Sequence, residues 1–99
     1  MARTDQRAHH RHTISRDVLL VLPGLAPASA RMLNTCIGGC LLGNIRDRTV
    51  LGALAEDPAS LVEICLFDED DNMIRLMGQQ RRVADSTLGV QFLEAQERL

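Results

Sequence analysis

The chain has 99 residues, of which 45% are hydrophobic and 24% are charged, and its formal net charge at pH 7 is −2. A chain of this length forms one domain around a single core. The small net charge excludes a strong general attraction to nucleic acid polymers, and no apolar run is long enough to insert into a membrane.

The first twelve residues are polar and have neither a helical nor a strand period. We therefore predict a flexible arm at residues 1–12 and a folded domain at residues 13–99. The arm is basic, because residues 1–16 contain four arginines and a single acid, Asp5. The arm is not followed directly by a hydrophobic stretch of the kind found in a secretory signal, so we do not expect one.

Short apolar segments separated by turn residues follow the arm and predict β-strands. The segments are residues 14–22, 30–34, 40–42, 61–67, a long strand of 73–77 and 81–84 broken by Gly78, and 88–93. In the fourth segment, Val62, Ile64 and Leu66 share one face, and the opposite face is also apolar. Gly89 in the last segment allows a close approach or a bulge.

Two segments of the sequence do not predict a strand clearly. Residues 46–60 stay open, because residues 49–54 fit a strand while Glu56 to Pro58 mark a turn. Residues 94–99 are good helix formers and predict one short C-terminal helix. Five or six short strands with regular turns predict a small antiparallel barrel, which removes the exposed sheet edges that an open sheet would leave.

The three cysteines, Cys36, Cys40 and Cys65, lie among apolar residues, which predicts reduced thiols in a cytoplasmic protein. The pair Cys36-x3-Cys40 has no nearby histidine and is a poor zinc site, so we expect no metal ion and no cofactor. No nucleophile–base pair or pair of carboxylates falls at a spacing typical of catalysis. We therefore expect a binding protein, not an enzyme.

Two stretches carry the polar groups best suited to hold a ligand. Arg7 and Arg11 place two guanidinium groups four residues apart in the arm, and the segment Asn34-Thr-Cys-Ile-Gly-Gly39 offers an amide, a thiol and two glycines. Guanidinium groups are planar, forked donors that bind phosphates or the O6 and N7 atoms of guanine. The pattern predicts a site for a flat anion such as a nucleotide.

In order and spacing, these residues resemble the signature of the PilZ domain family, Arg-x3-Arg followed by (Asp/Asn)-x-Ser-x-x-Gly. Arg7 and Arg11 match the first part, and Asn34, Cys36 and Gly39 match the second. The resemblance covers residues 6–94 and includes the closing Leu-Gly-Val-Gln-Phe strand. It implies an all-β fold, a six-stranded antiparallel β-barrel with a terminal helix, and binding of the bacterial second messenger cyclic di-GMP.

By this resemblance, the ligand-binding residues are Gln6, Arg7, Arg11, Asn34, Cys36, Gly38 and Gly39. The arm would close over the ligand, Asn34 would meet the guanine edge, and Gly39 would let the backbone come close. Cys36 stands where the family usually has serine. A thiol is a weaker hydrogen-bonding group than a hydroxyl, and losing one good bond costs about 0.5–1.5 kcal/mol, or about 2- to 13-fold in affinity.

The resemblance implies a stand-alone receptor whose arm changes conformation on binding and which signals to an unidentified effector protein, as a monomer or weak dimer. Outputs of such signalling include biofilm formation, motility and exopolysaccharide synthesis. The alternative is a ligand-independent PilZ-like adaptor, favoured by Cys36 and the two-faced apolar segment 61–67 but opposed by the presence of both arginines. A single-stranded nucleic acid binder is opposed by the negative net charge and by the fact that Phe67 and Phe92 are the only aromatic residues.

Overall fold

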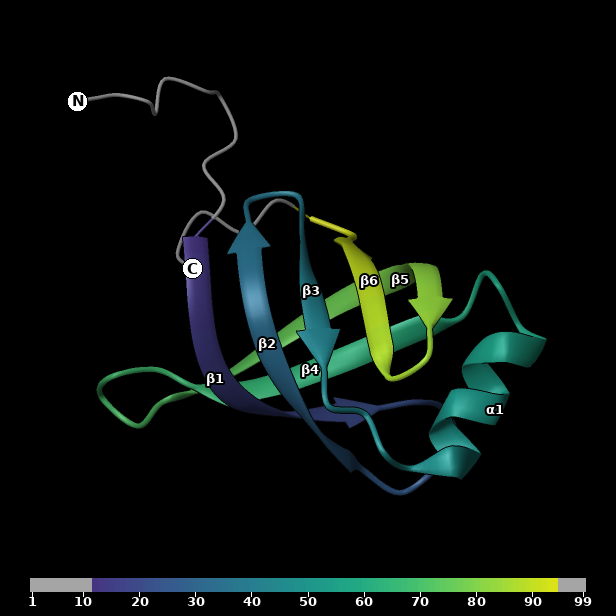
Figure 1. Cartoon of the computed structure of the whole chain (residues 1–99). Helices are drawn as coiled ribbons and strands as arrows, with labels where there is room; N and C mark the ends of the chain where they lie inside the picture. Colours follow the sequence, from purple (N-terminus) through teal and green to yellow (C-terminus); the bar gives the residue numbers. More distant parts are fainter. Residues whose placement is uncertain (1–11, 95–99) are drawn as a thin grey trace.

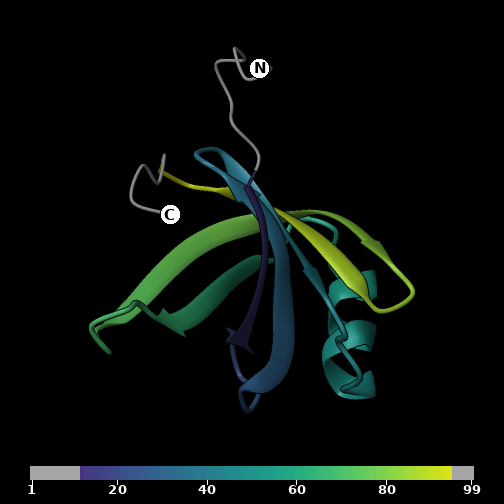
Figure 2. The same ribbon diagram turned by 60° about the vertical axis from the view of Figure 1, so that its left-hand side comes forward.

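Six strands and one helix make up residues 12–94, the part of the chain that this computed structural model describes (Figure 1). In chain order they are β1 (His12–Val21), β2 (Ala28–Cys36), β3 (Gly39–Gly43), α1 (Arg48–Glu56), β4 (Leu61–Phe67), β5 (Met73–Ala84) and β6 (Thr87–Phe92). The strands form a closed antiparallel barrel in the order β1-β2-β3-β6-β5-β4, whose curvature is visible from a second side in Figure 2. The predicted all-β, six-stranded barrel is therefore confirmed.

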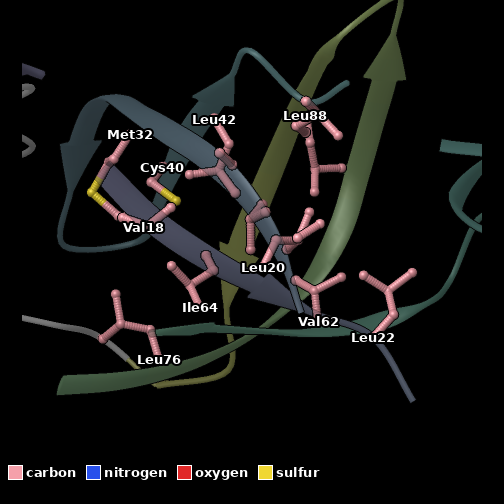
Figure 3. Close-up of a cluster of buried hydrophobic side chains, with 14 of the residues drawn as sticks. Val18, Leu20, Leu22, Met32, Cys40, Leu42, Val62, Ile64, Leu76 and Leu88 are labelled. Carbon is pink, nitrogen blue, oxygen red and sulfur yellow. The ribbon is translucent and has the colours of Figure 1, made fainter. Parts of the chain in front are cut away.

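Alternating apolar residues of the strands fill the interior of the barrel (Figure 3). β4 buries Val62, Ile64 and Leu66, which share one face as predicted, because successive strand residues point to opposite faces. The outward face of the same strand leaves Leu61 and Phe67 exposed. Each fully buried leucine or isoleucine stabilises the fold by about 1.5–3 kcal/mol. The largest fully buried side chains are Leu20, Met32, Leu42, Ile45, Leu54, Ile64, Leu66, Leu76 and Leu88.

The segment that the sequence left open is the helix α1, and the interpretation of residues 49–54 as a strand is wrong. The side chain of Asp47 caps the helix by accepting hydrogen bonds from the backbone N–H groups of Thr49 and Val50. Val50 and Leu54, one helical turn apart, are both buried against the barrel. The capping aspartate and this spacing outweigh the β-branched residues of the segment.

β5 is continuous from Met73 to Ala84, so the predicted break at Gly78 is also wrong. A Cβ atom at Gly78 would collide with the side chain of Val90 and lie 2.8 Å from the carbonyl oxygen of Gln91. The glycine therefore lets β5 and β6 approach closely within an unbroken ladder. The irregularity predicted at Gly89 is present in this ladder, but the extra residue, Arg81, lies on β5.

The division into an arm at residues 1–12 and a barrel at residues 13–99 stays a prediction, because residues 1–11 and 95–99 lie outside the described part of the chain. β1 already includes His12. The predicted C-terminal helix at residues 94–99 falls almost entirely outside that part as well. Within residues 12–94, no helix is both long and apolar enough to span a membrane.

Candidate functional site

A bulge in β2 turns Asn34 away from the core. Met32 pairs with Leu42 of β3, but Asn34 pairs with the next residue back, Leu41, so Leu33 is one extra residue in the ladder. Met32 is fully buried, and in a regular strand Asn34 would point to the same face. Because of the extra residue, Asn34 instead lines a depression on the outer surface.

The turn between β2 and β3 is held by backbone and hydroxyl contacts. The buried Thr35 lies within hydrogen-bonding distance of the carbonyl oxygens of Cys36 (3.4 Å) and Gly39 (3.3 Å). The carbonyl oxygen of Gly38 accepts a 2.9 Å hydrogen bond from the N–H of Phe92 on β6. These bonds fix the shape of the segment from Asn34 to Gly39 before any ligand binds.

Gly39 is required by strand packing. A Cβ atom at this position would collide with the carbonyl oxygen of Val90 on β6. Gly38, in contrast, has no heavy atom within 4 Å of such a Cβ. The close approach that was predicted at Gly39 is therefore an approach of two strands, and the predicted contact with a ligand stays a prediction.

Asn34, Cys36, Gly38 and Gly39 meet in one depression of about 320 Å³, which we call the glycine hollow. It runs across the outer face from β2 over β3 and β6 to β5. Its remaining lining residues are Cys40, Leu41, Arg81, Gly89, Val90 and Gln91. No carboxylate is among the described residues that line it, so an anion would meet no repelling charge there.

Arg81 and Gln91 belong to this hollow, and the sequence did not identify them. Arg81 lies in no recognisable motif, Gln91 lies in the closing strand but was not assigned to the site, and each is brought to the site by pairing of β6 with β3 and β5. Arg81 is exposed, and no carboxylate within residues 12–94 forms an ion pair with it. Among the described lining residues, Arg81 is therefore the one cationic, forked donor that a ligand could contact.

The two cysteines of the hollow differ in their surroundings. Cys36 is partly exposed at the surface, whereas Cys40 is buried beneath it, and both are free thiols. Burial, with a smaller contribution from the neighbouring Cys36, raises the pKa of Cys40 from 9.0 to about 12. Cys40 is therefore a neutral thiol at physiological pH and not a nucleophile. Within residues 12–94, no group of three His, Cys, Asp or Glu side chains is arranged to hold a metal ion.

Gln6, Arg7 and Arg11 lie outside the described residues, but the point where they join the barrel is defined. β1 begins at His12, which pairs with Thr35, and Thr13 pairs with Asn34. Figure 1 shows the start of β1 at the same end of the barrel as the turn between β2 and β3. The segment that carries the two arginines thus enters the fold beside the glycine hollow.

A larger depression of about 720 Å³ lies on another part of the outer surface, where β1 meets β4, and we call it the seam groove. Its most exposed apolar side chains are Leu19, Phe67 and Met73. Its two carboxylates are paired: Arg31 contacts Asp17 at 3.0 Å, and Arg75 contacts Glu63 at 2.7 Å. The seam groove is larger, but the polar groups suited to a nucleotide lie in the glycine hollow.

Comparison with solved structures finds a likeness to the crystal structure of the PilZ domain of CeSA from a cellulose synthesizing bacterium. The TM-score is 0.67, and the match covers 88% of this chain and 83% of that chain at 11% sequence identity. No family model matches the sequence, and no curated protein matches it. The chain therefore has a PilZ-like fold, as the order of its motifs predicted.

Proposed function

We propose that this protein is a receptor for cyclic di-GMP that holds its ligand between the glycine hollow and the two arginines of the N-terminal segment. The observation that carries the proposal is the register of β1 on β2. His12 pairs with Thr35, which belongs to the Asn34–Gly39 segment. Arg11 directly precedes His12 in the sequence. The PilZ-like fold and the order of the two motifs support the same ligand.

The chemistry of the hollow suits a guanine nucleotide. The amide of Asn34 offers both a donor and an acceptor to a guanine edge, and guanidinium groups can bond O6 and N7 or bridge a phosphate. The absence of a carboxylate from the described lining leaves the two phosphates of the ligand unopposed. Binding would hold residues 1–11 against the barrel, and the changed surface would then be recognised by an effector protein.

Isothermal titration calorimetry of the full chain with cyclic di-GMP tests this proposal. We expect Arg7→Ala and Arg11→Ala each to weaken binding by about 10- to 150-fold, because each removes a charge-assisted hydrogen bond. The matched control is Arg46→Ala, which removes an exposed arginine on the loop before α1, outside the glycine hollow. Absence of binding by the parent protein, or equal binding by parent and both variants, would contradict the proposal.

The seam groove favours a second candidate function, a ligand-independent adaptor. Phe67, one of two aromatic residues in the chain, has 58% of its surface exposed there, and exposed aromatic and methionine side chains are typical of protein interfaces. The two functions differ in the N-terminal segment. A receptor predicts chemical-shift changes for the backbone amides of residues 1–11 when cyclic di-GMP is added, and an adaptor predicts none.

A further inference from the structure

The glycine hollow extends well beyond the motif residues. Asn34 of β2 pairs with Leu41 of β3, and Leu41 pairs with Gly89 of β6. These positions form one line across three neighbouring strands, because paired residues lie opposite each other. The hollow continues onto β5 at Arg81. The half of the hollow over β6 and β5 contains none of the residues of the two motifs.

A second bulge, in β5, places Arg81 in this other half. Gln80 pairs with Val90 and Arg82 pairs with Gly89, so Arg81 is the extra residue of the ladder. Gln80 is held inside, where its Nε2 donates hydrogen bonds to the carbonyl oxygens of Leu54 (2.6 Å) and Asp57 (2.5 Å) at the end of α1. With Gln80 fixed inward, the bulge leaves both following arginines on the surface, and Arg81 lines the hollow.

Gly89 leaves the floor of this half open. A Cβ atom there would be 3.8 Å from the carbonyl oxygen of Arg82, an ordinary van der Waals distance, and its φ angle is not in the left-handed region. Packing therefore does not require glycine at this position, in contrast to Gly39 and Gly78, where a Cβ atom would collide with β6. A missing side chain that packing does not demand leaves bare backbone on which a flat group can rest.

We propose that Arg81 and the open backbone at Gly89 form a second half-site for one molecule of a dinucleotide ligand, an inference that rests on the proposed function. One guanine lies against the Asn34–Gly39 segment. The second nucleotide of the same molecule crosses β3 and rests over Gly89. The forked guanidinium of Arg81 binds the phosphate or the guanine edge of that second nucleotide.

Calorimetry with cyclic di-GMP on the full chain tests the half-site. We expect one ligand per chain for the parent protein and a loss of affinity of about 10-fold or more for Arg81→Ala, because a charge-assisted hydrogen bond is lost. Arg82→Ala is the matched control: this neighbouring arginine is also exposed but does not line the hollow, and we expect its removal to change affinity less than 2-fold.

A second pair of variants tests the floor of the half-site without removing charge. Gly89→Ala and then Gly89→Val add increasing bulk where packing has room, so the thermal midpoint should not fall, while affinity should fall stepwise. In heteronuclear NMR spectra of the parent, ligand should shift the Arg81 Nε–Hε signal and the amides of both halves. In Gly89→Val, only the amides of residues 34–39 should shift.

The outcomes separate this inference from the proposed function. If the parent binds cyclic di-GMP but Arg81→Ala and Gly89→Val bind it equally well, the half-site is wrong and the receptor function stands. If Arg82→Ala weakens binding as much as Arg81→Ala does, the effect is general charge and the half-site is again wrong. If the parent does not bind the ligand at all, both proposals fail together.

Discussion

The glycine hollow and the seam groove are two depressions of this barrel that are formed in different ways. The seam groove is lined by exposed apolar side chains, among them Leu19, Phe67 and Met73, and by Asp17 and Glu63, each of which forms an ion pair with an arginine. The hollow is shaped by the backbone, through a bulge on each flank and glycines between them. Exposed apolar side chains are typical of protein interfaces, whereas bare backbone beside an exposed arginine suits a flat anion.

Experiments on each depression test this difference. The largest effect is expected for the thiol of Cys40 beneath the glycine hollow. The pKa of Cys40 is about 12 in the folded protein against 9.0 ordinarily, so above pH 9 the unfolded chain loses a proton that the folded chain keeps. The free energy of unfolding should therefore be unaffected by this group below pH 9. It should fall by about 1.4 kcal/mol per pH unit above that, up to roughly 4 kcal/mol by pH 12.

Urea unfolding measured between pH 8 and pH 12 checks this prediction. The chain contains neither lysine nor tyrosine, so few other groups titrate in that range. Cys40→Ala should abolish the decrease in unfolding free energy that Cys40 causes above pH 9. Cys65→Ala, a substitution in the seam groove, leaves Cys40 in place and should show the same decrease as the parent. Equal slopes for the parent and Cys40→Ala would show that the hollow does not cover a buried thiol.

The next largest effect is expected at two of the glycines of the hollow, Gly39 and Gly89. Gly39→Ala should destabilise the protein by about 1–3 kcal/mol, because its Cβ atom has to displace the β6 backbone at Val90. Gly89→Ala, the matched control in the same hollow, should leave stability unchanged or raise it by about 0.4–1 kcal/mol. Chemical denaturation of both variants gives the comparison, and equal destabilisation would mean that packing requires both glycines.

A smaller effect is expected for the sulfur at the mouth of the hollow. Cys36→Ser replaces a weak hydrogen-bonding group by a hydroxyl and should tighten the binding of cyclic di-GMP by about 2- to 13-fold. Calorimetry on the parent and the variant measures the ratio. Unchanged or weaker binding would indicate that residue 36 does not contact the ligand.

The smallest effect is expected in the seam groove. Asp17→Ala removes the ion pair with Arg31. The side chain of Asp17 is 86% exposed and that of Arg31 is 41% exposed, so the free energy of unfolding should fall by no more than about 1 kcal/mol. Affinity for cyclic di-GMP should not change, because Asp17 does not line the glycine hollow. A clear loss of affinity in calorimetry would mean that the two depressions are not independent.

Local patterns were enough to predict most of the barrel. Alternation in the segment 61–67 correctly placed Val62, Ile64 and Leu66 on one face of β4, since that pattern has a period of two and needs no knowledge of neighbours. Because the opposite face is also apolar, only the structure showed which of the two faces is buried. The segment of α1 was misjudged because its signals are an aspartate cap and a single pair of buried residues, Val50 and Leu54, within nine residues. Such a short helix depends on packing against the barrel more than on propensity.

The sequence by itself determined that this chain forms a small antiparallel barrel and that Asn34, Cys36, Gly38 and Gly39 lie close together, because they share one turn. Only the tertiary structure decided which way Asn34 points and brought Arg81, Gly89 and Gln91 to the same hollow. The physical reason is register: a bulge exists only relative to a partner strand, so its position, and the face to which every later side chain points, follow from the pairing of strands distant in sequence.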